Sequence, residues 1–173
     1  EMAHGRGVSI ECELGKIGTT DFVETDKDEE LYTQPEEAAE FVRQTGVDAL
    51  AVSVGTAHGN YIVRQPKVDI ARLQAIRELT DVALVLHGGS GVPAEMIQAG
   101  VKLSGGGISK VNIATDLEDA FLKSIGREER LTNAECNALE PELLARGMSA
   151  VEATVSEKIK GFLNSAGKAG LFG

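Results

Sequence analysis

The chain has 173 residues, the length of one ordinary domain, and its apolar and charged fractions of 42% and 25% exclude an intrinsically disordered or collagen-like protein. Acidic side chains outnumber basic ones by 27 to 17. The resulting formal charge of -10 argues against a nucleic-acid partner, because a phosphate backbone requires a surplus of Lys and Arg.

Neither a membrane segment nor a secretion signal is predicted. No apolar run approaches the roughly 20 residues that cross a bilayer, and the N-terminus lacks the basic and then apolar order of a signal peptide. Cys12 and Cys136 are too few for a disulfide framework and do not form a C-x-x-C pair, which suits a reducing compartment. We expect a cytoplasmic protein without membrane association.

Apolar runs and helical patterns alternate along the chain. Strands are predicted over four runs, at residues 8–14, 49–54, 82–86 and 109–113. A helical pattern follows each strand. The first two cover about 33–46 and 69–79, the third opens near 93, the fourth runs through 121, and a further helix covers about 149–163. Because strand–helix–strand crossovers are right-handed, this order predicts an α/β fold with a parallel sheet of βα repeats.

Particular residues mark the predicted helix boundaries. Thr33 and Glu36 form a capping-box pattern, and Gly46 is expected to end that helix. Asp69 is expected to cap the next helix. The apolar face of that helix would carry Leu73, Ile76 and Leu79.

Four βα units make half of an eight-fold barrel. Polar residues and glycines gather at the C-terminal ends of all four predicted strands, where open sheets and TIM barrels bind ligands. TIM barrels typically need about 250 residues, so we expect the C-terminal half of a TIM (β/α)8 barrel with C-terminal helices. The βα units would occupy about 7–127 and the helical segment about 128–173, with 1–173 belonging to one domain.

Two histidines occupy equivalent places at predicted strand ends. His58 and His87 each follow a strand and precede a glycine, so neighbouring parallel strands would bring the two imidazoles together. Beside the acidic face of the first strand, they suit Zn²⁺, which accepts histidine nitrogen and carboxylate oxygen. The alternative is a pair of capping or hydrogen-bonding histidines, because catalytic zinc requires three protein ligands and the third histidine, His4, precedes the first strand.

Turns rich in glycine and polar residues follow the third and fourth predicted strands. The turn that begins at Gly88 and includes Ser90, and the turn from Asn112 to Thr115, leave N–H groups and hydroxyls able to hold phosphate at a helix start. Glycines that merely permit close turns are the alternative for each loop. Two such loops on successive strands favour phosphate binding.

Acidic side chains line one face of the first predicted strand. Glu11 and Glu13 would point into the barrel if Cys12 faces the helices, and an inward carboxylate needs a cation or hydrogen-bond donors. Lys110, on the fourth strand, is the expected structural partner of Glu11. Glu13 lies nearer the strand's C-terminal end, where it would either ligate or orient a metal, or make a plain hydrogen bond.

Five ordered motifs recur in one enzyme family. They are GVSIECELGKIG, YTQPEEAAEFV, DALAVSVGTAHGNY, LVLHGGSGVP and KVNIATDL. From Gly7 to Phe121, and more loosely into the C-terminal helices, the chain closely resembles the class II, zinc-dependent ketose-bisphosphate aldolases, such as the fructose-bisphosphate and tagatose-bisphosphate enzymes.

Carried over residue by residue, the resemblance implies that His58 and His87 are zinc ligands and that Glu13 lies at an alternative or second metal position. It implies that the phosphate and the dihydroxyacetone portion of the substrate, in part around a monovalent Na⁺ or K⁺ ion, are held by Gly59, Gly88, Ser90, Asn112 and Thr115. Asp21 is the nearest match to the family's catalytic loop acid, with a solvated loop acid as the alternative. The family's third zinc histidine, and the aspartate before it, are expected upstream of Glu1.

The resemblance therefore implies a class II aldolase, a lyase of carbohydrate metabolism including glycolysis. It would cleave a ketose phosphate or bisphosphate reversibly to dihydroxyacetone phosphate and an aldehyde, through a zinc-stabilised enediolate. A homodimer or homotetramer is expected, and the 173 residues alone are expected to be inactive. The alternatives are a metal-free sugar-phosphate isomerase-type barrel and a catalytically silent half-barrel that binds phosphate or another subunit. The motifs do not distinguish between ketoses.

Overall fold

The computed structural model describes residues 1–19, 31–61 and 65–172, which belong to two compact units, residues 1–112 and 113–173. The first unit contains a four-stranded parallel sheet, whose spatial order is β1 (Glu11–Leu14), β3 (Ala49–Val52), β5 (Ala83–Leu86) and β6 (Ile108–Val111). A second parallel pair joins β2 (Gly18–Thr19) to β4 (Ala57–His58). The prediction of a parallel α/β sheet with βα repeats is confirmed.

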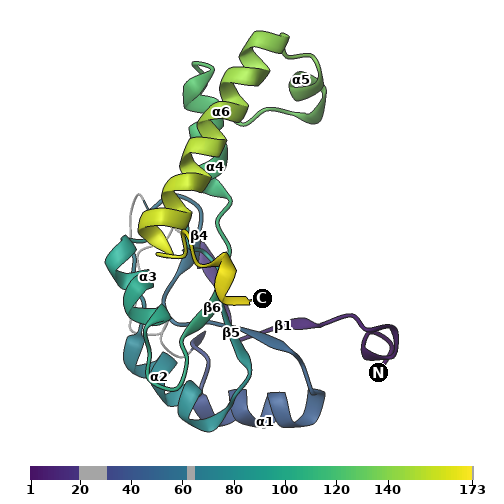
Figure 1. Cartoon of the computed structure of the whole chain (residues 1–173), viewed down its shortest axis with the longest axis vertical. Helices are drawn as coiled ribbons and strands as arrows, with labels where there is room; N and C mark the ends of the chain where they lie inside the picture. The colour runs from purple at the N-terminus through teal and green to yellow at the C-terminus, as the bar shows by residue number, and fades with distance from the viewer. Residues whose placement is uncertain (20–30, 62–64, 173) are drawn as a thin grey trace. The chain divides into compact units, whose positions relative to one another are not determined.

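Three helices accompany the four-stranded sheet, and they are α1 (Pro35–Thr45), α2 (Ile70–Leu79) and α3 (Ala94–Val101). They lie along one side of it in Figure 1. Fully buried aliphatic side chains from strands and helices form the core, among them Leu50, Val52, Leu84, Leu86, Leu73, Ile76 and Ile97. Because burial of each such side chain contributes roughly 1.5–3 kcal/mol, this packing holds the helices against the sheet.

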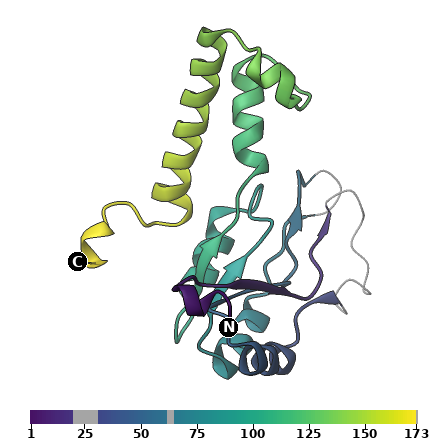
Figure 2. The same cartoon turned by 90° about the vertical axis from the view of Figure 1, so that its right-hand side faces the viewer.

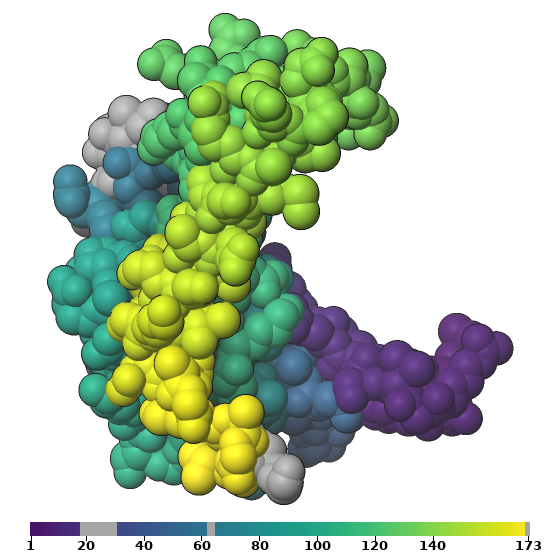
Figure 3. Space-filling model, turned by 45° about the horizontal axis from the view of Figure 1, so that its top comes forward, coloured from purple at the N-terminus to yellow at the C-terminus, as the bar shows by residue number. Residues whose placement is uncertain are grey.

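The N-terminal residues contain a short 3-10 helix, η1 (His4–Arg6), and project from the first unit, in purple in Figure 3. Strand β1 begins at Glu11, so the predicted start at residue 8 is too early. The carbonyl of Ile10 accepts from the N–H groups of both Asp48 and Ala49, and its own N–H donates to the Asp48 carboxylate at 2.7 Å. The bond from Ala49 belongs to the parallel pairing of Glu11 with Ala49, and the two bonds with Asp48 reinforce the start of the strand.

The predicted capping box at Thr33 is wrong. Helix α1 begins after Gln34, which makes no side-chain cap bond. Thr33 is buried, and its hydroxyl donates to the carbonyl of Leu14 at 2.6 Å while it accepts from the N–H of Ser53 at 2.8 Å. Tertiary hydrogen bonds therefore occupy the oxygen that a capping interaction would use.

Two other predicted boundaries are confirmed. Gly46 ends α1 in the left-handed conformation, and the Asp69 carboxylate accepts from the N–H of Arg72 as the N-cap of α2. Leu79 was predicted to be on the apolar face of α2 but is 50% exposed, because at 100° per residue it lies about 120° around the helix from the fully buried Leu73. Arg77 is buried instead, because it lies only about 40° around the helix from Leu73, on the side away from Ile76.

The buried guanidinium of Arg77 bonds three backbone carbonyls. Nε donates to Gly106 at 2.7 Å, Nη1 to Thr80 at 2.9 Å and Nη2 to Val82 at 2.7 Å. These charge-assisted bonds tie the end of α2 to the turn before β6.

The second unit is helical and contains α4 (Thr115–Ser124), α5 (Asn133–Asn137), α6 (Pro141–Glu157), the π-helical turn η3 (Lys158–Phe162) and the 3-10 turn η4 (Ala169–Phe172). Helices α4 and α6 run side by side (Figures 1 and 2). Gly147 permits this approach, because a Cβ at that position would lie 2.3 Å from the ring of Phe121. Lys158 and Asp116 form an ion pair at 2.7 Å.

The predicted helix at 149–163 begins earlier, at Pro141, whose ring suits the first helical turn. The structure also adds α5, which was not predicted as a separate helix and which has a capping box between Thr132 and Glu135. Within the described parts of the chain, no helix combines the length and the apolar character needed to cross a membrane.

Candidate metal and substrate site

The two predicted site histidines lie close together. His58 ends β4 and His87 directly follows β5, and their ring centroids are 6.1 Å apart with a 52° angle between the planes. The His58 residue is exposed, whereas the side chain of His87 is only 17% exposed. The prediction that the fold brings these imidazoles together is confirmed.

Two carboxylates of β1 hold the ring of His87. Its Nδ1 lies 2.7 Å from Oε2 of Glu13, and its Nε2 lies 3.1 Å from Oε1 of Glu11. The carboxylates fix the orientation of His87 and place negative charge beside it.

The predicted salt bridge between Glu11 and Lys110 is confirmed. Nζ of Lys110 donates to Oε2 of Glu11 at 2.7 Å. This hydrogen bond, with a further contribution from His87, holds the pKa of the Glu11 carboxyl below its ordinary value, although partial burial opposes the shift. Lys110 is 51% exposed, so solvent screens the pair and its contribution to stability is small.

Zinc can be tested against this arrangement by its donor atoms and distances. Imidazole nitrogen and the carboxylate of Glu13 are donors that zinc accepts. With Zn–N bonds of about 2.0–2.1 Å, two imidazole rings bound to one tetrahedral zinc ion have their centroids about 5 Å apart. The centroids of His58 and His87 are 6.1 Å apart, so the two rings would have to approach each other by about 1 Å to share the ion. Among the residues that the structure describes, no group of three or more His, Cys, Asp or Glu side chains is arranged to hold a metal ion. The donor types fit zinc, but the ligand set needs a third member, and one ring nitrogen of His87 would have to exchange its carboxylate partner for the metal.

The glycine-rich turn after β5 packs against β4 and β6. Gly88 has a φ of +67°, and a Cβ there would lie 2.5 Å from the carbonyl oxygen of Ala57. The N–H of Gly89 donates to the carbonyl of Asn112 at 3.0 Å. Ser90 is buried in the same turn, at 4% exposure. The structure thus brings the backbone of three predicted substrate-binding positions, Gly88, Ser90 and Asn112, to adjacent strand ends.

The remaining predicted positions are distributed differently. Gly59 follows His58 directly and has a φ of +103°. Thr115 is the first residue of α4, in the second unit. Asp21 lies outside the described residues.

Sequence reasoning missed two contacts of His87. One is the hydrogen bond from its Nε2 to Glu11, and the other is a bond of 2.7 Å from the hydroxyl of Thr56 to its backbone carbonyl. These contacts span 76 and 31 residues along the chain. No local pattern signals either of them.

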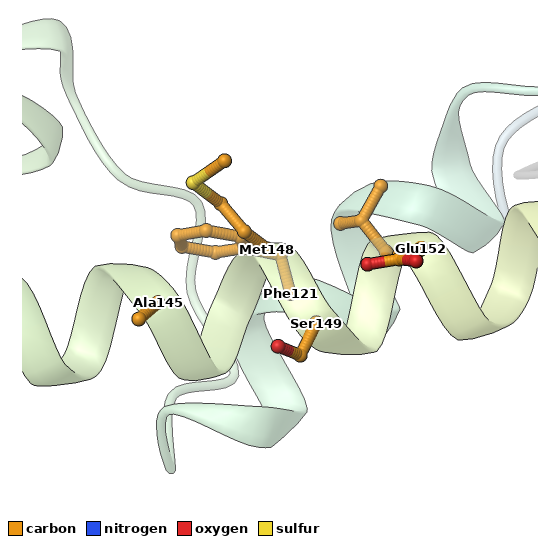
Figure 4. Close-up of a pocket in the computed structure, with 6 residues that line it drawn as sticks. Phe121, Ala145, Met148, Ser149 and Glu152 are labelled. Carbon is orange, nitrogen blue, oxygen red and sulfur yellow. The ribbon is translucent and has the colours of Figure 1, made fainter.

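A separate hollow lies in the second unit, with a volume of about 540 Å³ (Figure 4). It lies along α4 and α6 and is lined by Phe121, Ala145, Met148, Ser149, Val151 and Glu152. These residues include none of the predicted site positions, so the histidines are the better candidate for the reaction site.

Comparisons with known proteins agree with the resemblance. A model of the family "Fructose-bisphosphate aldolase class-II" matches residues 1–168. A fructose-bisphosphate aldolase of Geobacillus stearothermophilus is 41% identical over 172 residues, which are 98% of this chain and 56% of that protein.

Solved structures give the same result. The YdjI aldolase from Escherichia coli K12 is 32% identical, with a TM-score of 0.71 over 97% of this chain and 52% of that one. A putative fructose-1,6-biphosphate aldolase from Coccidioides immitis is 32% identical, with a TM-score of 0.75 over 97% of this chain and 56% of that one. These likenesses are consistent with a partial TIM-barrel fold, and the chain spans about half the length of the relatives that it matches. From its family match and its 41% identity to an aldolase, the chain belongs to the class-II fructose-bisphosphate aldolase family.

Proposed function

We propose that this chain is the C-terminal half-barrel of a class II aldolase that cleaves a ketose phosphate reversibly into dihydroxyacetone phosphate and an aldehyde. The pairing of His58 and His87 at 6.1 Å, with Glu13 on the second ring, is the observation that carries the proposal. The four parallel strands are half of those in a TIM barrel, and the named relatives are aldolases. The isomerase and silent half-barrel alternatives are not favoured, because the matched family and relatives are aldolases.

In this proposal His58, His87 and a histidine upstream of Glu1 hold zinc, and Glu13 supplies an alternative or second metal position. When bound, zinc would act as a Lewis acid that polarises the substrate carbonyl and stabilises the negative charge left when the carbon–carbon bond breaks, without a Schiff-base lysine. Glu13 orients His87 through its Nδ1 contact, as carboxylates do beside metal-binding imidazoles.

The glycine-rich turns would hold and orient the substrate. Backbone N–H groups around Gly59 and Gly88, with the polar side chains of Ser90, Asn112 and Thr115, would bind the phosphate and the attached triose, in part with a Na⁺ or K⁺ ion. A fixed phosphate places the carbonyl next to the histidines, which removes much of the entropic cost of reaction. Asp21 would transfer a proton in the same reaction. Its Asp21→Asn variant should then lose turnover while keeping its metal content.

We propose further that the complete protein is a cytoplasmic homodimer or homotetramer. The 173 residues by themselves are proposed to be inactive, because β1 and β6 are the outer strands of the described four-stranded sheet and a third histidine is needed. The isolated chain should self-associate or unfold rather than persist as a monomer.

The test uses the complete protein that contains this chain. Purified protein should release dihydroxyacetone phosphate from fructose or tagatose bisphosphate, lose this activity on dialysis against a strong chelator, and regain it with Zn²⁺. Borohydride added with substrate should trap no lysine adduct, because no Schiff base forms. Full turnover without metal, or formation of only an aldose phosphate, would contradict the proposal.

A further inference from the structure

A buried hydroxyl links the two histidine-bearing segments. Thr56 directly precedes β4, which ends at His58, and is 2% exposed. Its Oγ1 donates to the backbone carbonyl of His87 at 2.7 Å. A single side chain two residues from one histidine therefore binds the main chain of the other.

The backbones of these two segments also touch directly beside the histidines. A Cβ at Gly88, the residue after His87, would lie 2.5 Å from the carbonyl oxygen of Ala57, the residue before His58. The N–H of Ala57 donates to the hydroxyl of Tyr61 at 2.9 Å, and this bond also restrains β4. The two segments are therefore in close contact at the residues that flank His58 and His87.

We propose that Thr56 is a positioning residue, whose bond to the carbonyl of His87 sets the separation of the His58 and His87 rings and, through it, the affinity for zinc. The zinc part of this inference rests on the proposed function. Functional groups must be held within about 0.5 Å of their working geometry. The separation of the two ring centroids is already about 1 Å larger than a shared tetrahedral ion allows, so any further separation would weaken zinc binding. Loss of the hydroxyl would let the His87 segment move away from β4.

The chain offers a matched control for the folding effect of such a bond. Thr33 is 1% exposed, and its hydroxyl donates to the carbonyl of Leu14 at 2.6 Å. Thr33 therefore makes the same kind of bond to a backbone carbonyl as Thr56, and it also accepts from the N–H of Ser53 at 2.8 Å, but neither of these partners is a histidine. Thr56→Val and Thr33→Val each remove one buried hydroxyl and keep the branched shape of the side chain.

Zinc affinity of the complete protein is measured by competition with a chromophoric chelator. Thr56→Val should bind zinc about tenfold more weakly, which is the lower end of the effect of groups that orient metal ligands. Thr56→Ser, which keeps the hydroxyl, should restore most of the affinity, and Thr33→Val should bind zinc like the unsubstituted protein. Equal affinity in Thr56→Val, a Thr56→Ser variant as weak as Thr56→Val, or equal losses in Thr33→Val and Thr56→Val would overturn the proposal.

A second measurement needs no metal. Histidine-labelled protein without zinc gives imidazole NMR signals, and His4 serves as the internal reference. Thr56→Val should shift the signals of both His58 and His87 and leave His4 in place, whereas unchanged signals would refute the positioning role. If the unsubstituted protein binds no zinc, the metal part of the proposed function fails, and this comparison still decides the role of Thr56. If Thr56→Val does not fold, Thr56→Ala compared with Thr33→Ala takes its place.

Discussion

Replacement of Gly88 by alanine should destabilise the protein through two separable effects. The φ of +67° costs an L-residue about 1–2 kcal/mol, because the left-handed region crowds its Cβ. The added Cβ would also lie 2.5 Å and 2.8 Å from the carbonyl oxygen and carbon of Ala57, which are backbone atoms that cannot rotate away. Overpacking of this kind typically costs about 1–3 kcal/mol, so we expect a total loss near 3–4 kcal/mol.

Gly46 supplies the control for this prediction. Its φ is +64°, and a Cβ there would meet nothing within 4 Å, so Gly46→Ala should cost only the conformational strain of about 1–2 kcal/mol. Thermal unfolding of the complete protein should therefore show a drop in melting temperature that is about twice as large for Gly88→Ala as for Gly46→Ala. Equal shifts in the two variants would show that the contact between Gly88 and Ala57 does not constrain the turn.

Three further predictions concern charge, phosphate and burial. The folded pKa of Glu11 is depressed, so the contribution of this carboxylate to stability is full above the ordinary glutamate pKa of about 4.3 and is lost as the pH falls through the folded pKa. Lys110→Met should raise the pKa of Glu11 in a carboxyl NMR titration and move this loss of stability to higher pH. An unchanged titration of Glu11 in Lys110→Met would be contrary evidence. Ser90→Ala should raise the KM for a phosphorylated ketose more than for its unphosphorylated analogue, whereas equal losses would mean that Ser90 only shapes the turn. Arg77→Met should lower the free energy of unfolding by about 3–5 kcal/mol, because three backbone carbonyls, of which that of Val82 is buried, lose a charged donor. The 71%-exposed Arg43 changed to Met should cost less than about 1 kcal/mol, and similar costs for the two variants in urea titrations would refute this reasoning.

Local patterns predicted most of the elements because they carry the information that local structure uses. The left-handed end of α1 needs a glycine, and Gly46 is there. The carboxylate of Asp69 finds the N–H of Arg72 three residues away. Thr33 shows the limit of such reasoning, since its capping pattern competes with bonds to Leu14 and Ser53 that only the folded chain supplies.

The candidate site was predictable to the level of strand ends and faces. The alternation of β1 indicated that Glu11 and Glu13 share a face, and the order of the strands indicated that His58 and His87 converge. The contacts on His87 were not predictable, because they depend on rotamers and on main-chain approaches between distant segments. Pro141, in contrast, was a usable signal that was missed, since a proline in the first turn marks the true start of α6.

Zinc content of the purified complete protein tests the central claim most directly, measured by elemental mass spectrometry for the unsubstituted protein and for three histidine variants. We predict that His58→Ala and His87→Ala each lose bound zinc and aldol cleavage together. His4→Ala should retain both, because His4 is exposed and bonds Asp48 at 2.8 Å rather than either site histidine. Undiminished zinc in His58→Ala and His87→Ala, or aldol cleavage that survives the loss of zinc, would contradict a metal site at these two residues.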